Sequence, residues 1–237
     1  MSPLGFDPLK DLLQMTVSAP YYGDSSVMRT PPPDLPSLLL KERIVYLGLP
    51  LFSDDDSKRQ LGMDVTELII AQLLYLEFDN AEKPIYFYIN STGTSWYTGD
   101  AIGFETEAFA ICDTLSYIRP PVHTICIGQA MGTAAVILSA GSKGQRAALP
   151  HASIVLHQPR SGAQGQATDI QIRAKEVIHN KQAMLEILSK NTGRSVEQLS
   201  KDSDRMSYLN PQEAIEYGLI DRVLSSRKDL PDPTPLK

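Results

Sequence analysis

Hydrophobic positions in this chain alternate between two spacings, one typical of buried strands and one typical of helices. Short apolar runs rich in β-branched or aromatic side chains predict strands, and longer segments with apolar residues three or four positions apart predict helices. The alternation is typical of an α/β fold with a largely buried, mainly parallel sheet. In chain order we predict strand 43–47, helix 65–77, strand 85–89, helix 108–118, strand 122–127, helix 131–140 and strand 153–156.

The segment that follows these strands has a different character. Residues 160–166 are rich in Gly and Gln and carry no core pattern. A long helix is predicted from Thr168 to about Lys190, with Thr168 and Gln171 as a capping box and Gly193 just beyond its end. At about 1.5 Å per residue it would span roughly 30 Å, long enough to project from a domain. An ordinary core helix is the alternative, and the loose segment in front of it favours a projecting arm.

The C-terminal part of the domain predicts one more helix and one more strand. Asn210 fits an N-cap, Pro211 the first helical position and Gly218 the stop signal. Residues 219–223 are predicted to form a closing strand.

Pro-rich segments at both ends set the expected domain boundaries. The run TPPPDLP at 30–36 cannot continue a helix or a central strand, because proline has no amide hydrogen. We therefore predict a flexible N-terminal arm over residues 1–36, one domain over 37–225 and a Pro-rich tail over 226–237.

Composition narrows the class of protein without identifying it. With 237 residues and 42% apolar side chains, the chain can bury the core of one globular domain. The formal net charge of −6 argues against nucleic acid as a partner, because phosphate binding needs a basic patch. No apolar run reaches the roughly 20 residues of a membrane span, and no secretory or transit signal is evident. We expect a reducing, cytosol-like compartment, with Cys112 and Cys126 as buried core residues.

Five short segments then carry a resemblance to a known family. They are YINS at 88–91, TICIGQA at 124–130, HQP at 157–159, GQATDI at 165–170 and EAIEYGLID at 213–221. With these segments in the family's order and spacing, the chain resembles the proteolytic subunit of the ATP-dependent Clp protease, the ClpP family. The resemblance implies an α/β fold of the ClpP/crotonase-like type, with stacked β-sheets, surrounding helices, and a projecting handle strand and long helix at about 160–192.

The resemblance also locates a serine-protease triad that this chain does not preserve. The family's serine lies in a segment like GQAASMGA, and the matching segment GQAMGTAA at 128–135 places Gly132 at the serine position. His157 matches the family's base, whereas Met206 falls at the position of the orienting aspartate. Glycine cannot attack a carbonyl, and a thioether cannot stabilise an imidazolium. A small shift in the alignment toward Asp202 or Asp204 is the alternative that would restore an acid.

The positions that match the family's oxyanion site are altered as well. Thr94 replaces a glycine, and a β-branched residue is poorly suited to the backbone angles that glycine can adopt there. Thr133 carries the nearest hydroxyl to Gly132, but it lies one residue later, rotated by about 100° on a helix start. Residues are also inserted within 95–109 relative to the family. The inserted segment is expected either to obstruct the substrate groove or to form a new contact.

Loss of the serine together with this insertion resembles the ClpR-type subunits, inactive paralogues of cyanobacteria and plastids. The resemblance implies active ClpP-type subunits as partners, in two stacked heptameric rings of mixed composition, and an AAA+ Clp unfoldase. It assigns ring-to-ring contact to Gly165, Gln166, Asp204 and Arg205, and an apolar unfoldase-docking pocket to Tyr86, Tyr88, Ile125, Ile127 and Leu149. The alternatives are a solvated Asp204–Arg205 pair and, for the apolar set, ordinary core residues.

The sequence therefore predicts a non-catalytic structural subunit of a hetero-oligomeric Clp protease. We expect it in the cytoplasm, or in the plastid stroma if it is plastid-encoded, without cofactor or metal. His123, His151 and His179 show no metal-ligand spacing. A residual or altered crotonase-fold enzyme, with weak peptidase or acyl-CoA chemistry, is the alternative function. A third possibility, an adaptor acting alone, does not account for the preserved handle.

Overall fold

A seven-stranded sheet organises the part of the chain that the structure describes. The computed structural model describes residues 34–52, 64–96, 101–159 and 165–230. The strands are β1 (Ile44–Leu47), β2 (Ile85–Ser91), β3 (Val122–Met131), β4 (Ala147–Ala148), β5 (Ser153–Leu156), β6 (Ser207–Leu209) and β7 (Arg222–Val223). The helices are α2 (Leu35–Lys41), α4 (Val65–Asp79), α5 (Glu105–Tyr117), α6 (Thr133–Ser139), α7 (Ala167–Thr192), α8 (Val196–Asp202) and α9 (Pro211–Tyr217), and a 3-10 turn spans Arg227–Asp229.

The long strand β3 is shared between two parts of the sheet. Strands β1, β2, β3, β4 and β7 are neighbours in that order and run parallel. The first half of β3 pairs with β4, whereas its end pairs with β5, where Gln129 lies opposite Ser153. Strand β6 pairs antiparallel with β5. The mainly parallel α/β sheet is therefore confirmed, and it is the family fold that the resemblance implied.

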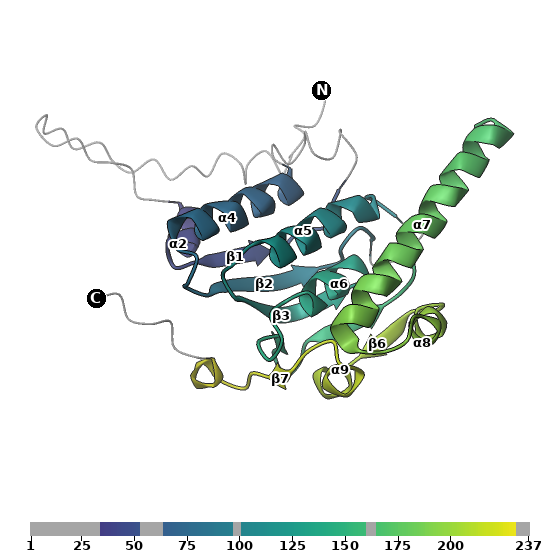
Figure 1. Cartoon of the computed structure of the whole chain (residues 1–237). Helices are drawn as coiled ribbons and strands as arrows, with labels where there is room; N and C mark the ends of the chain where they lie inside the picture. The colour runs from purple at the N-terminus through teal and green to yellow at the C-terminus, as the bar shows by residue number, and fades with distance from the viewer. Residues whose placement is uncertain (1–33, 53–63, 97–100, 160–164, 231–237) are drawn as a thin grey trace, which may run out of the picture. The chain divides into compact units, whose positions relative to one another are not determined.

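Two hydrophobic clusters lie on opposite faces of this sheet. Because side chains alternate along a strand, Ile85, Phe87 and Ile89 of β2 face the main core, which also receives the helices α4, α5, α6 and α7. Figure 1 shows α4, α5 and α6 along one face of the sheet. Tyr86 and Tyr88 point to the other face, into a smaller cluster.

Several element boundaries differ from the predictions. Strand β3 continues to Met131, so the next helix begins at Thr133 rather than at 131. Helix α5 begins at Glu105, ahead of the predicted 108, and the closing strand is reduced to β7. Helix α2 begins at Leu35, inside the predicted arm, whose residues 1–33 lie outside the described residues, as do 231–237 of the tail. The short elements β4, β6 and α8 were not predicted: β4 and β6 are stabilised by pairing with distant strands, whereas α8 has a local start signal in its N-cap Ser195.

The long helix predicted for 168–190 is confirmed as α7, but its predicted start is wrong. Its N-cap is Gln166, which makes no side-chain capping bond, so Thr168 lies inside the helix and forms no capping box. The buried side chains of α7 are all in its C-terminal part: Asn180, Met184, Leu185 and Leu188. Figure 1 shows the N-terminal part extending beyond the neighbouring helices, as the projecting-arm interpretation required. The predicted N-cap Asn210 does form a capping box, with Glu213.

Arg146 and Asp221 join the end of α6 to the C-terminal strand. Two guanidinium nitrogens of Arg146 donate to the two carboxylate oxygens of Asp221, at 3.0 and 2.6 Å, and Nη1 also donates to carbonyls of Ser139 and Asn191. Burial alone would raise the pKa of Asp221. The hydrogen bonds and positive charge of Arg146 outweigh that effect and hold the pKa below its usual value.

This ion pair predicts an acid-dependent contribution to stability. Because the pKa of Asp221 is lower in the folded state, its contribution is complete above the unfolded value, near about 4, and is lost as the pH falls through the folded value. An Asp221→Asn variant should therefore be less stable than the wild type at pH 7, and the difference should shrink in acid. Thermal unfolding at a series of pH values measures it; a difference independent of pH would contradict the assignment.

Among the described residues, no helix combines the length and the apolar character needed to cross a membrane.

Cys112 and Cys126 are buried and unpaired, as predicted, and burial raises the pKa of each thiol to about 12.

Candidate functional site

Gly132 lies where strand β3 turns into helix α6. Its backbone has φ +52° and ψ −115°, a region that glycine reaches without a steric penalty and other residues rarely adopt. The amide of Gly132 donates to the carbonyl of Val155 in β5 at 2.8 Å. This bond brings the turn close to His157, which follows directly after β5.

The imidazole of His157 occupies the space beside Gly132. A Cβ built on Gly132 would overlap Nε2 of His157 and lie 2.6 Å from its Cε1. The ring is only 6% exposed, so it cannot turn away into open solvent without rearrangement of its surroundings. The structure therefore brings together the two residues that match the family's nucleophile and base, and the His157 ring lies in the space that a Cβ at the nucleophile position would occupy.

The second ring nitrogen of His157, Nδ1, contacts an uncharged backbone carbonyl oxygen. Nδ1 lies 3.1 Å from the carbonyl of Gln158, and because a carbonyl can only accept, Nδ1 carries the hydrogen in this contact. In a working triad this bond goes to a carboxylate that also stabilises the imidazolium. A neutral carbonyl can fix the tautomer, but it cannot supply that charge.

Met206 is close to His157 along the strand register. Strand β5 pairs with β6 so that Leu156 lies opposite Ser207, and Met206 and His157 are the residues that directly adjoin this last pair. The gap-free alignment that placed Met206 at the acid position is therefore consistent with the geometry. The Met206 sulfur accepts a hydrogen bond from the Tyr208 hydroxyl at 3.8 Å.

The two nearby aspartates do not replace the missing acid. The carboxylate of Asp202 is held by the hydroxyl of Tyr217 and the amide of Gln198, both at 2.7 Å. Burial, and then the bond to Asp202, raise the pKa of Tyr217, so this hydroxyl remains a donor. Asp204 is exposed, and it is its backbone carbonyl, not its carboxylate, that accepts from the side chain of Gln158 at 3.4 Å.

Thr94 and Thr133 form a buried pair beside Gly132. The backbone amide of Thr94 donates to Oγ1 of Thr133 at 2.9 Å, and the two hydroxyl oxygens lie 3.2 Å apart. Both residues are 4% exposed. Thr94 matches an oxyanion donor of the family. Its amide hydrogen is already bonded to Thr133 and so is not available to an oxyanion. The same bond occupies the Thr133 hydroxyl, which leaves it poorly placed as a substitute nucleophile.

The Thr94–Thr133 bond was missed by sequence reasoning. The signal available was the pairing of two substitutions, because a threonine replaces a family glycine at 94 while another threonine follows Gly132. Only the fold shows that they face each other. Gly93, with φ +66°, permits this approach, since a Cβ there would overlap Oγ1 of Thr133.

The residues predicted for ring-to-ring contact lie on two separate elements. Gly165 has φ +139° and Gln166 caps α7, so neither forms the predicted strand, and residues 160–164 of that strand lie outside the described residues. A strand needs a pairing partner, and the described strands of this chain offer none at this point. Asp204 and Arg205 are both exposed between α8 and β6, and no ion pair joins them among the described residues.

The five residues predicted for unfoldase docking come together. They belong to the small cluster on the far face of the sheet, where Ala147 and Leu224 complete the buried part. Tyr86 and Ile125 are buried in this single chain, whereas Tyr88, Ile127 and Leu149 remain half-buried. Tyr86 and Ile125 are therefore core residues of this chain, the other three form a partly open apolar surface, and docking of an unfoldase at these residues stays a prediction.

Comparison with known proteins identifies the family of the chain. The sequence profile of the Clp protease family matches residues 33–227. The chain belongs to the Clp protease family. It is 78% identical, over 92% of its length and 96% of the relative, to a Clp protease proteolytic subunit-like protein of Synechococcus elongatus. A subunit-like protein of Synechocystis is 76% identical over the same shares of the two chains.

A chloroplast protein of a plant is also similar to this chain over nearly its whole length. The proteolytic subunit-related protein 4 of Arabidopsis thaliana chloroplasts is 44% identical over 98% of this chain and 72% of the relative.

Among the described residues no group of three His, Cys, Asp or Glu side chains is arranged to hold a metal ion.

Proposed function

We propose that this chain is a non-catalytic structural subunit of a hetero-oligomeric ATP-dependent Clp protease. The observation that carries the proposal is the position of His157, whose ring fills the space that a nucleophile at residue 132 would need. Met206 at the acid position and the Thr94 amide bound by Thr133 support it independently. Loss of one triad member alone typically costs a factor of about 10⁴ to 10⁶ in rate.

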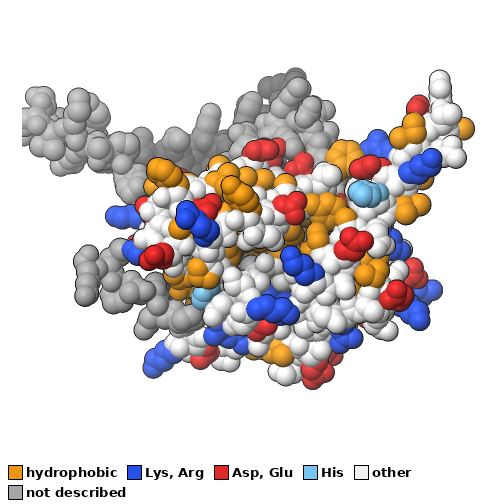
Figure 2. Space-filling model, viewed as in Figure 1, with side chains coloured by type: hydrophobic (Ala, Val, Ile, Leu, Met, Phe, Trp, Pro, Cys, Tyr) orange, Lys and Arg blue, Asp and Glu red, His pale blue; other side chains and the backbone are white. Residues whose placement is uncertain are grey.

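Exposed apolar surface supports a role in assembly. Tyr75 and Phe78 on α4 and Tyr117 at the end of α5 are 56%, 90% and 77% exposed, which is unusual for such large side chains on a monomer. Figure 2 shows hydrophobic side chains gathered over α2 and α4. In the proposed complex these side chains contact active ClpP-type subunits within mixed heptameric rings. The apolar surface formed by Tyr88, Ile127 and Leu149 receives a hydrophobic segment of a AAA+ Clp unfoldase.

The remaining contacts follow from the same proposal. Two stacked rings give a hetero-tetradecamer, in which the region from Gly165 to Gln166 and the exposed Asp204–Arg205 pair meet the opposite ring. A desolvated Arg–carboxylate contact there would set the register between rings. The similarity to cyanobacterial subunit-like proteins suits a cytoplasmic location.

Native mass spectrometry of the endogenous complex tests the assembly. The expected result is a particle that contains this chain together with a ClpP-type subunit that carries an intact triad. A particle built from this chain alone would contradict the proposal.

Peptidase assays test the lack of catalysis separately. The purified full chain should not hydrolyse a short fluorogenic peptide above background. Hydrolysis that disappears on His157→Ala substitution would show a working base and would overturn the non-catalytic assignment.

A further inference from the structure

The N-terminal half of α7 receives little support from the hydrophobic core. The first side chain buried along this helix is Asn180, fourteen positions into a 26-residue helix (Ala167 being the first), and the apolar anchors Met184 to Leu188 lie beyond it. Ile172 and Ile178 are each 68% exposed. A lone helical segment of about 12 residues is marginal in water. Contacts outside the core are therefore needed to keep this half of the helix ordered and in place.

A short segment leading into helix α5 supplies such contacts. Residues 102–106, here named the strut, begin on the wall of the degenerate site. The amides of Ile102 and Gly103 both donate to the carbonyl of Thr94, at 3.0 and 3.3 Å. Just before the strut, Ala101 pairs with Ser95 in an isolated antiparallel bridge. The start of the strut is thus fixed to the residue whose own amide is bound by Thr133.

The strut then meets α7 at two points. The guanidinium carbon of Arg173 lies 5.3 Å from the centroid of the Phe104 ring, within the range of a cation–π interaction. The second point joins Glu105, at the start of α5, to Asn180: both side chains are buried, burial raises the pKa of Glu105, and the neighbouring Asn180 side chain partly offsets that effect. Because these helix residues are seven positions apart, the two contacts span about 10 Å of the helix axis. Two separated contacts can fix an angle, which a single contact cannot.

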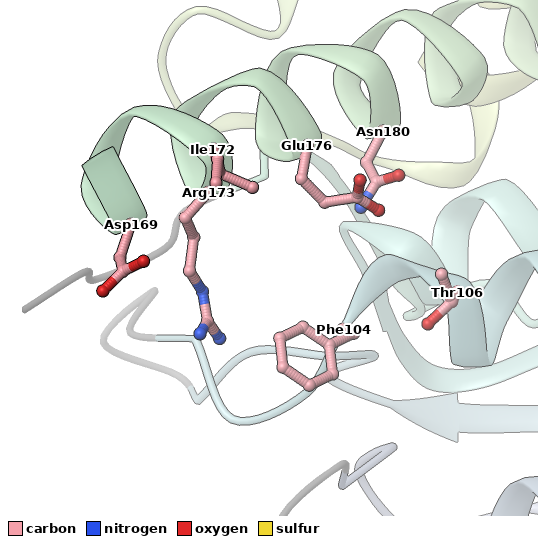
Figure 3. A pocket seen from close by; sticks show the side chains of 7 residues that line it. All are labelled: Phe104, Thr106, Asp169, Ile172, Arg173, Glu176 and Asn180. Carbon is pink, nitrogen blue, oxygen red and sulfur yellow. The ribbon is translucent and has the colours of Figure 1, made fainter.

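Figure 3 shows how the two sides face each other. Phe104 and Thr106 lie on one side of a cavity of about 540 Å³, and Arg173 reaches across it from α7 toward the Phe104 ring. Asp169 and Glu176 flank Arg173 on the helix, yet among the described residues no ion pair joins either to Arg173. Arg173 is therefore directed to the aromatic ring rather than to its neighbours on the helix.

The deeper contact is the more constrained one. Glu105 is 6% exposed and Asn180 is 5% exposed. A buried polar side chain is costly unless it has polar neighbours, and Glu105 has its own backbone amide and the side chain of Asn180 as such neighbours. Their pairing holds the first turn of α5 against the middle of α7.

We propose that the strut locks the projecting half of α7 to the body of the protein through Arg173 and Asn180. The lock lies between the degenerate site and the long helix, and it begins at the carbonyl of Thr94, whose amide is bound by Thr133. The helix is then held at one angle whether or not a substrate is near, as suits a structural subunit. The lock itself is a property of the isolated chain and stands apart from the proposed lack of catalysis.

Hydrogen exchange of the full chain tests the lock. A Phe104→Ala substitution removes the aromatic partner of Arg173, and amide exchange in residues 169–179 should become about two- to five-fold faster. Exchange in residues 184–192, which the core holds, should not change. An Arg173→Ala variant should give the same increase, and the double variant should add little to either single one.

Trp96→Ala is the matched control. Trp96 is 46% exposed, close to the 48% of Phe104, and belongs to the same inserted segment, but it packs edge-on against Phe52 at 5.8 Å between ring centroids. This variant should leave exchange in α7 unchanged. The proposal is overturned if Phe104→Ala has no effect on residues 169–179, if Trp96→Ala has an equal effect, or if exchange rises equally in residues 184–192.

Discussion

A Gly132→Ser variant is expected to remain inactive toward a fluorogenic peptide, even though it restores the family's nucleophile. Three obstacles would persist. The new Cβ would collide with the His157 ring, no acid would stand behind that ring, and the Thr94 amide would still be bound by Thr133. A wrongly supported histidine costs about 10⁴ in rate and a lost oxyanion donor about 10² to 10³. Hydrolysis should therefore stay at background.

A Gly132→Ala variant separates the steric effect from the chemistry. It has the same added Cβ and the same unfavourable φ but no hydroxyl. Both variants should lose about 1–3 kcal/mol of folding free energy, measured by chemical unfolding. Activity should need Met206→Asp and Thr133→Val in addition to Gly132→Ser, because these supply an acid and release the Thr94 amide, and the His157 ring must also shift away from the new side chain. Hydrolysis by the single Gly132→Ser variant that depends on His157 would show that the site is less degenerate than its geometry indicates.

The pattern of the sequence predicted the central elements well, for a physical reason. The first parts of strands β2 and β3 are buried on both faces and are mainly apolar, and the buried apolar residues of α4 recur at helical spacing. The end of β3 was not predictable in this way. Its last residues extend into a strand because Ala130 and Met131 pair with β5, a contact that no local pattern contains. Thr168 matched a capping box locally, but the helix begins earlier, at Ala167.

In the candidate site, too, the sequence predicted which residues occupy the key positions, but not the contacts that those residues make in the fold. The motifs located Gly132, His157 and Met206, because each occupies a fixed place in a segment that resembles the family. They did not reveal that the His157 ring fills the space beside Gly132, which depends on the bond from Gly132 to Val155. Nor did they reveal that Asp202 is held by Tyr217, which excludes it as the acid. Such competing contacts decide whether a residue is available for chemistry.

Arg43 was predicted only as the first residue of a strand, yet it organises one edge of the fold. It precedes β1, is 8% exposed and adopts φ +60°, a rare conformation for a side-chain-bearing residue. Its guanidinium donates to Asp79 at 3.0 Å, which lies at the end of α4. It also donates, at 2.8–3.1 Å, to the backbone carbonyls of Leu76, Asn80, Lys83 and Pro84. One side chain thus holds the end of α4 and the turn into β2.

An Arg43→Met variant is expected to lose about 3 kcal/mol or more of folding free energy. Methionine keeps much of the length but none of the donors, so several carbonyls would lose a partner in a partly buried turn. Arg43→Lys should be intermediate, because a single ammonium has three donors and lacks the planar fork. Urea unfolding of the full chain measures each change.

Arg119→Met is the matched control for Arg43. Arg119 also forms an ion pair with a carboxylate of α4, that of Glu77, at 3.2 Å. The side chain of Arg119, however, is 76% exposed. Exposed pairs contribute about 0–1 kcal/mol, so this variant should be nearly neutral. If Arg43→Met cost no more than Arg119→Met, the end of α4 would be held by Leu73 and Leu76 in the core alone. A large difference would show instead that the buried guanidinium sets the position of α4, whose exposed Tyr75 and Phe78 are proposed to contact the neighbouring subunit.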